Sequence, residues 1–167
     1  YKIDLDIDFQ QEQIIGKTRL TLTATGQPID TLALSLLNYQ IDSIQYNNGG
    51  LPSYQYDDTT ITVALQQPLK QQDTAGITIF YQGDPPLDPT GWGGFYFRQG
   101  FAFNLGVGFG AKPHNFGRAW FPCLDNFTDR ARYDFYVTTP ANKKAFCNGC
   151  FRICNRDRMA ERSGTGN

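Results

Sequence analysis

The first ten residues alternate between apolar and polar side chains, and this pattern constrains the fold more than any other feature of the sequence. Tyr1, Ile3, Leu5, Ile7 and Phe9 alternate with polar residues. Because successive side chains of a strand point to opposite faces, this period of two predicts a half-buried β-strand. The same rhythm returns over residues 20–24, 32–36, 61–65 and 77–81.

Turn-forming residues separate these runs. They occur at Gly26-Gln27-Pro28, Asn47-Asn48-Gly49-Gly50, Asp57-Asp58 and Gln67-Pro68. Short strands between such turns predict an all-β fold, an antiparallel β-sandwich or saddle-like β-domain with short helical turns only. We expect consecutive antiparallel strands up to about residue 83. One helical segment of about two turns is expected near Asp125 to Ala131.

From Gly83 onward the pattern changes to large aromatic residues between glycines. Two interpretations stay open: a thick core with bulges, or a face that a neighbouring domain covers. The alternating runs already largely fill the two inner faces of a sandwich, so we expect some of these aromatics in an exposed patch bordered by Phe109, His114 and Phe116. The aromatics of this region are Trp92, Phe95, Tyr96, Phe97, Phe101, Phe103, Phe109, Phe116, Trp120 and Phe121.

Composition excludes several classes of function. The formal net charge is -1 and the chain contains 1 His. A chain without a basic field is a poor partner for nucleic acid or an anionic membrane. No apolar run approaches the roughly 18 residues of a membrane span. A single imidazole makes a complete catalytic metal site improbable, and we expect a soluble protein, either cytoplasmic or exported.

Four small features favour structural roles. The carboxylates of Asp4, Asp6 and Asp8 lie along one straight strand, where they cannot converge on a calcium ion, so they predict a solvated face. Cys147, Cys150 and Cys154 could form half of a zinc knuckle, a disulfide or, as we favour, free thiols. Cys123 lies in an apolar context and is expected to react slowly with alkylating reagents. His114 is more typical of a hydrogen-bonded loop residue than of a catalytic group. We predict no catalytic residue and no metal ligand.

The segment from Arg118 to Asp125 carries the most specific motif. Its sequence, Arg-Ala-Trp-Phe-Pro-Cys-Leu-Asp, resembles the Arg-x-x-Phe-Pro-Cys-Phe-Asp element in the N-terminal domain of aminopeptidase-N-like zinc metallopeptidases. These are the gluzincin aminopeptidases, which include the leukotriene hydrolases. Shorter similarities occur in the family's order at residues 15–20, 29–34, 39–44, 65–69, 77–83, 94–96 and 147–149. The resemblance covers residues 1–149, and it implies structural roles for Arg118, Phe121, Pro122, Cys123 and Asp125.

The resemblance implies a saddle-like N-terminal β-domain docked on a thermolysin-like catalytic domain. In the family that catalytic domain binds zinc through a His-Glu-x-x-His motif and a later Glu, and none of these motifs occurs in the 167 residues. The chain alone is therefore expected to bind no cofactor and to be inactive, with zinc in a downstream catalytic domain. Its expected partners are that domain, which it would brace, and a peptide substrate, whose cleft it would wall. The docking candidates are Phe109, Phe116, Trp92 and Tyr96.

One departure from the family pattern concerns recognition of the substrate. The family's N-terminal domain lends a Gln or Glu, a few residues before the motif Arg, to bind the substrate amine. Residues 110–118 contain neither. The candidates that face substrate are therefore Lys112, His114 and Asn115, and Lys112 would repel a substrate ammonium.

Two alternatives remain open at this stage. The chain could be a stand-alone β-sandwich interaction module derived from the same family without peptidase activity. It could also bind carbohydrate, with Trp92, Tyr96 and Trp120 as stacking platforms. Residues 150–167 form an atypical Arg-rich tail, which is expected to be disordered or to mark an artificial boundary of the chain.

Overall fold

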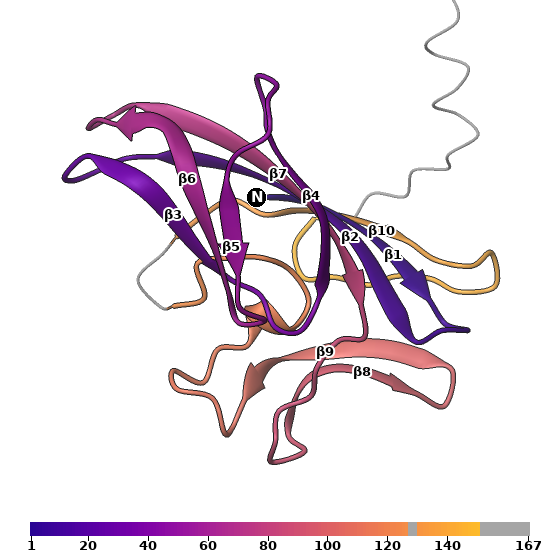
Figure 1. Cartoon of the computed structure of the whole chain (residues 1–167). Helices are drawn as coiled ribbons and strands as arrows, with labels where there is room; N and C mark the ends of the chain where they lie inside the picture. The colour runs from indigo at the N-terminus through magenta and orange to yellow at the C-terminus, as the bar shows by residue number, and fades with distance from the viewer. Residues whose placement is uncertain (127–129, 151–167) are drawn as a thin grey trace, which may run out of the picture.

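The computed structural model describes residues 1–126 and 130–150, and the strands in these ranges form three sheets (Figure 1). The largest has five strands in the order β10-β1-β2-β7-β4, the second has three in the order β3-β6-β5, and the third is the hairpin β8-β9. The strands are β1 (Lys2–Asp8), β2 (Gln13–Thr23), β3 (Ile29–Ser35), β4 (Gln40–Tyr46), β5 (Tyr54–Tyr56), β6 (Thr60–Leu69), β7 (Thr74–Gly83), β8 (Gly93–Arg98), β9 (Phe101–Gly108) and β10 (Asp134–Thr138).

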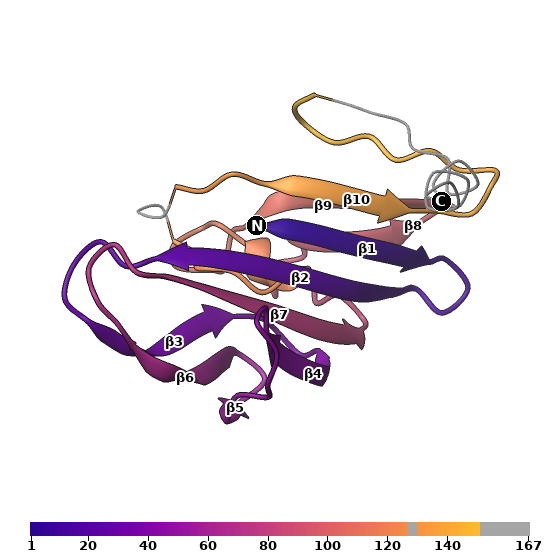
Figure 2. The same cartoon turned by 90° about the horizontal axis from the view of Figure 1, so that it is seen from above.

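The sheets enclose one apolar core. The alternation in β1 places Ile3, Leu5 and Ile7 on the buried face, as the sequence predicts. The three-stranded sheet contributes Leu32, Leu34, Ile61 and Val63 to the same core. Seen from above, the β8-β9 hairpin lies near β10 and β1, and the three-stranded sheet lies near β7 and β4, at the opposite edge of the five-stranded sheet (Figure 2). The five alternating runs lie in or at the ends of β1, β2, β3, β6 and β7, so the all-β fold class is confirmed.

Two details differ from the expected order of strands. The five-stranded sheet is not wholly antiparallel, because β10 pairs with β1 in parallel, with Lys2 opposite Asp134. This pairing is possible because β10 comes from the far end of the described chain and not from a hairpin turn. The described residues around the expected helix, 124–126 and 130–133, are not helical, and residues 127–129 lie outside the described ranges. The short helical turn forms instead as a 3-10 helix, η1, at Gly117–Ala119. The tail beyond residue 150 also lies outside the described ranges.

Gly16 and Tyr81 pack closely against each other in the large sheet. They lie opposite each other in β2 and β7, and the Tyr81 ring crosses the space that a side chain at residue 16 would fill. A Cβ at Gly16 would lie 2.1 Å from the Cζ of Tyr81. Only glycine therefore fits beneath this fully buried tyrosine.

Candidate functional site

Two buried tyrosine hydroxyls hold the segment that contains the family motif. The Tyr39 hydroxyl donates to the carbonyl of Ala119 at 2.9 Å, and the Tyr81 hydroxyl donates to the carbonyl of Trp120 at 3.0 Å. The two rings pack edge to face with their centroids 5.3 Å apart. Burial raises the pKa of both hydroxyls above the ordinary tyrosine value, because the phenolate would lose its hydration. Both therefore stay protonated and act as permanent donors to the motif backbone.

The second half of the motif pairs with the end of β3. The backbone N–H of Ser35 donates to the carbonyl of Cys123 at 2.8 Å, and the N–H of Cys123 returns a bond of 3.1 Å to Ser35. Pro122 is fully buried, and Cys123 is 3% exposed. The Phe-Pro-Cys element is thus part of the core and not a surface motif.

Alkylation should separate the cysteines by their burial. A buried thiol is both inaccessible and hard to ionise, whereas Cys147 and Cys150 are exposed. We expect Cys123 to react with iodoacetamide at least about tenfold more slowly than the two exposed thiols in native buffer, and at a similar rate in denaturant. Peptide mass spectrometry measures this. Equal native rates would show that the motif is not packed as described.

Asp125 closes the motif through a hydrogen-bonded network. Its Oδ2 accepts from the Arg118 guanidinium at 2.7 Å, and its Oδ1 accepts from the Asn115 side-chain amide at 2.8 Å. The backbone N–H of Gly117 donates to the same Oδ1 at 3.2 Å. The Asp125 side chain is 5% exposed. The carboxylate therefore ties the loop before the motif to its end.

Aromatic rings surround the motif on its other side. Trp120 stacks on Phe135 with the ring centroids 5.2 Å apart, and it contacts Phe121 edge to face. Trp120 also lies 6.1 Å from the Phe95 ring. Since the half-buried indole packs against the rings of Phe95, Phe121 and Phe135, it is not an open platform for a sugar ring, which argues against the carbohydrate-binding alternative.

Asp88 fixes a second loop, which borders the hairpin. This buried carboxylate accepts hydrogen bonds from the backbone and hydroxyl of Thr90 and from the backbone N–H of Gly110, the last at 3.0 Å to each oxygen. The hydrogen bonds from Thr90, the largest effect, lower the pKa of Asp88 below its ordinary value. Asp88 therefore stays ionised at neutral pH and joins residues 88–92 to the loop after β9.

The hairpin strand β9 has its large apolar side chains on the outside. Phe101, Phe103, Leu105 and Val107 are exposed, whereas Ala102 and Asn104, which lie between the first three, are half-buried. Tyr96 of β8 stacks on Phe103 with the centroids 5.1 Å apart. Trp92 (66% exposed) and Phe109 (64%) extend this surface at one end of the hairpin, where the Phe109 N–H donates to the Trp92 carbonyl. We call this surface the β9 face; it consists of Trp92, Tyr96, Phe101, Phe103, Leu105, Val107 and Phe109.

The aromatic residues of 91–121 thus fall into two groups. Some belong to a thick core with a bulge, and the others form an exposed face, so each of the two interpretations of the sequence applies to a part of them. Phe95, Phe116 and Phe121 are buried, and the register shift between Gly93 and Phe95 supplies the expected bulge. The β9 face accounts for the exposed members. Phe116, one of the expected docking residues, is 4% exposed. Its ring lies against Gly94 and Gly108, so it supports the β9 face from below and is not on it.

The residues expected to face substrate do not form one cluster. Lys112 and His114 are exposed, and Nδ1 of His114 lies 3.3 Å from the Gly108 carbonyl. The His114 and Phe109 rings are neighbours, with centroids 6.5 Å apart. Asn115 points inward to Asp125, and its buried Oδ1 has no hydrogen-bond partner among the described residues. No pattern in the sequence indicates this inward orientation.

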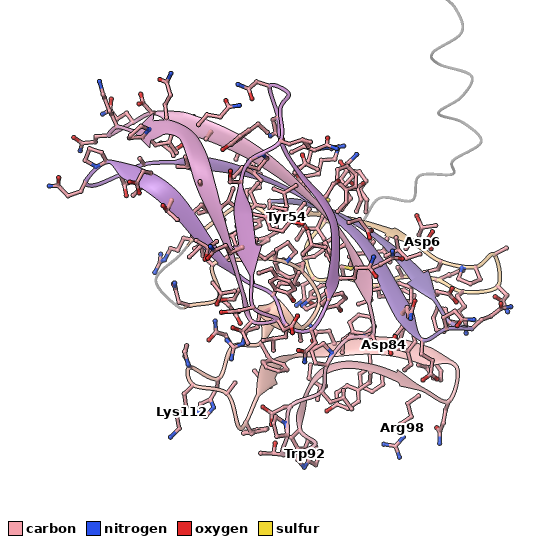
Figure 3. All side chains as sticks on the ribbon, in the orientation of Figure 1. Asp6, Tyr54, Asp84, Trp92, Arg98 and Lys112 are labelled. Atoms are coloured by element: carbon pink, nitrogen blue, oxygen red, sulfur yellow. The ribbon has the colours of Figure 1, made fainter. Side chains whose placement is uncertain are left out.

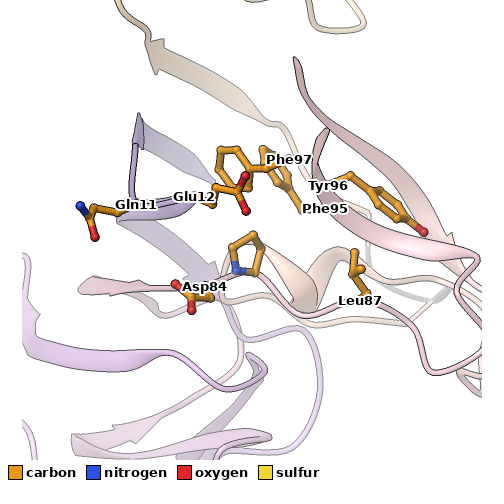
Figure 4. A pocket seen from close by; sticks show the side chains of 8 residues that line it. Gln11, Glu12, Asp84, Leu87, Phe95, Tyr96 and Phe97 are labelled. Atoms are coloured by element: carbon orange, nitrogen blue, oxygen red, sulfur yellow. The ribbon is translucent and has the colours of Figure 1, made fainter. Parts of the chain in front are cut away.

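A shallow pocket of about 250 Å³ lies beside the hairpin (Figure 4). Phe95, Tyr96 and Phe97 line it from β8, with Glu12 and Asp84 across from them. The residues that line the pocket include carboxylates and aromatic rings but no histidine, cysteine or serine.

The described residues do not fit a metal centre. In residues 1–126 and 130–150 no three His, Cys, Asp or Glu side chains are grouped so that they could share a metal ion. The most buried carboxylates, Asp88 and Asp125, accept hydrogen bonds from the chain's own donors. The same ranges contain no helix with the length and apolar character needed to cross a bilayer.

The fold and motif together define the class of this protein. Residues 1–159 match the model of the Peptidase M1 N-terminal domain, and the chain belongs to that family. This confirms the resemblance to the zinc aminopeptidases and leukotriene hydrolases.

Solved structures support the same assignment. A mutant M1 zinc metallopeptidase from Deinococcus radiodurans, bound to a Tyr-Ser-Ala substrate, superposes with a TM-score of 0.80 at 26% identity, over 93% of this chain and 35% of that one. Yeast LTA4 hydrolase in complex with bestatin shares the fold, with a TM-score of 0.60 at 14% identity, over 83% of this chain and 22% of that one.

One relative is named for transcription initiation and not as a peptidase. The transcription initiation factor TFIID subunit 2 of Schizosaccharomyces pombe is 24% identical over 172 residues, which is 83% of this chain and 14% of the relative. The chain therefore spans 35% or less of each of these three proteins.

Proposed function

We propose that this chain is a non-catalytic N-terminal domain that braces a downstream zinc metallopeptidase domain and forms one wall of its peptide cleft. Similarity to the M1 zinc metallopeptidases supports the class of partner. In this proposal the zinc ion and the water that it activates belong to the downstream domain. The described residues of this chain contribute position and shape, not chemistry.

The β9 face is the observation that carries the proposal. An exposed strand normally turns its polar residues to solvent, whereas β9 turns out two phenylalanines, a leucine and a valine. Contiguous exposed apolar surface of this kind is typical of an interface with another domain. A partner that covers Phe101 and Phe103 would gain about 2 kcal/mol for each ring removed from water.

The loop at the end of this face is positioned to form the wall. Asp88 holds Gly110, and Asp125 holds Asn115 and Gly117, so both ends of residues 110–117 are fixed by buried carboxylates. Lys112 and His114 extend from this anchored loop into solvent. A domain docked on the β9 face would lie beside them, and we place the peptide there.

Removing the two phenylalanines from the β9 face should separate the domains. In a longer protein that carries this chain ahead of its metallopeptidase domain, we expect Phe101→Ser with Phe103→Ser to lower the docking free energy by about 4 kcal/mol. The single thermal transition of the docked protein should then split into two, and peptide hydrolysis should fall. Calorimetry and hydrolysis of an aminoacyl anilide measure these effects.

The matched control is Leu51→Ser. Leu51 is 77% exposed but lies in the turn between β4 and β5, away from the hairpin. Its loss should leave the single transition and the activity unchanged. If the double variant also behaves like wild type, the β9 face is not the docking surface.

The relationship to TFIID subunit 2 favours a second candidate, a β-sandwich interaction module without peptidase activity. That relative is named for transcription initiation and not for proteolysis. The coding sequence downstream of this chain distinguishes the two: a His-Glu-x-x-His motif with a later Glu supports the metallopeptidase. Its absence supports the interaction module.

A further inference from the structure

The loop after β9 presents one exposed cation. Lys112 points away from the fold in Figure 3, at the same end of the molecule as Trp92. Across residues 1–126 and 130–150 the one ion pair joins Arg118 to Asp125, and Lys112 forms neither an ion pair nor a hydrogen bond. Its ammonium is therefore available to a ligand.

No carboxylate of this region is available to balance that charge. Residues 109–118 contain no Asp or Glu. The two carboxylates that contact the loop are Asp88 and Asp125, and both are buried and fully engaged with Thr90, Gly110, Asn115 and Arg118. The remaining acceptor, the Oδ1 of Asn115, is buried as well. The loop thus exposes a positive charge, whereas the two carboxylates that bind it are buried.

This inference rests on the proposed function, in which residues 109–115 wall the peptide cleft. We propose that Lys112 makes the assembled enzyme select peptides whose N-terminal residue has a carboxylate side chain. The Lys112 ammonium attracts such a carboxylate and repels the bare ammonium of a peptide with a neutral first residue. The flexible stem of lysine allows its point charge to follow the carboxylate without a fixed bidentate geometry.

The test compares two substrates that differ in charge but hardly in shape. Glutamyl and glutaminyl anilides are hydrolysed by the longer protein that carries this chain, and the ratio of their kcat/KM values is measured. We expect glutamyl to be preferred about tenfold, as one partly shielded ion pair allows. In Lys112→Met the ratio should fall to about one through a higher KM for the glutamyl substrate, because the lost ion pair acts on binding.

Lys70→Met is the control. Lys70 lies in the turn between β6 and β7, at another end of the fold, and its removal should leave the ratio unchanged. A wild-type ratio near one, or a ratio that Lys112→Met does not alter, overturns this inference while hydrolysis itself leaves the proposed function standing. If the protein hydrolyses neither substrate and no alanyl anilide either, the proposed function is overturned and this inference with it.

Discussion

Replacing Gly16 by alanine should destabilise the 167-residue chain by about 3 kcal/mol, the upper part of the range for overpacking a filled core. The added Cβ would lie 2.1 Å from the Cζ of Tyr81, with the ring carbon Cε2 and the hydroxyl oxygen each at 2.5 Å. The ring cannot simply move aside, because its hydroxyl is bonded to the Trp120 carbonyl in the motif segment. Chemical denaturation, followed by tryptophan fluorescence, measures the loss.

Gly26→Ala is the matched control for this substitution. No atom lies within 4 Å of the Cβ that alanine would add there, and Gly26 lies in the turn between β2 and β3. Its effect should stay within about 0.5 kcal/mol of wild type. If the two variants are equally stable, Tyr81 does not cross Gly16 in the way described.

Removing the Asp125 carboxylate should cost about 3 kcal/mol of folding free energy. In Asp125→Ala the Arg118 guanidinium, 17% exposed, loses its ion pair at 2.7 Å. The Asn115 amide and the Gly117 N–H lose their acceptor in the same step. We expect Asp125→Asn to retain part of these bonds and to fall between alanine and wild type.

The control for Asp125 is Asp6→Ala. Asp6 is exposed on β1, where the alternation of the strand turns it to solvent. Its removal should change the midpoint of urea denaturation little, within about 0.5 kcal/mol. An Asp125→Ala midpoint no lower than that of Asp6→Ala would contradict the role of Asp125 as the closure of the motif.

The sequence predicts the strands of the large core better than the hairpin. In β1, β3, β6 and β7 one face is buried, so the apolar positions recur with a period of two and mark both the strand and its inner face. In β9 the period is also two, but Phe101 and Phe103 alternate with Ala102 and Asn104 and point outward. Periodicity alone cannot tell which face a protein buries, and for β9 the inner side is packed by small residues.

Other features depended on contacts between residues far apart in the chain. The parallel pairing of β10 with β1 joins residues more than a hundred positions apart, which no local pattern marks. The Arg118–Asp125 motif could be identified as a unit from the sequence. The hydrogen bonds that hold its backbone come from Tyr39, Tyr81 and Ser35, which are distant in the sequence. The inward turn of Asn115 follows from the Asp125 carboxylate and could not be inferred from the spacing of the two residues.

The central claim is that the β9 face is covered by a downstream domain. Hydroxyl-radical footprinting of side chains tests it directly, because modification follows solvent accessibility. Trp92, Phe101 and Phe109 are 66%, 70% and 64% exposed in this chain. We predict that their modification falls at least about fivefold in the longer protein, as burial at an interface requires, while Leu51 is modified equally in both. Equal modification of Trp92, Phe101 and Phe109 in the chain and in the longer protein would contradict the account.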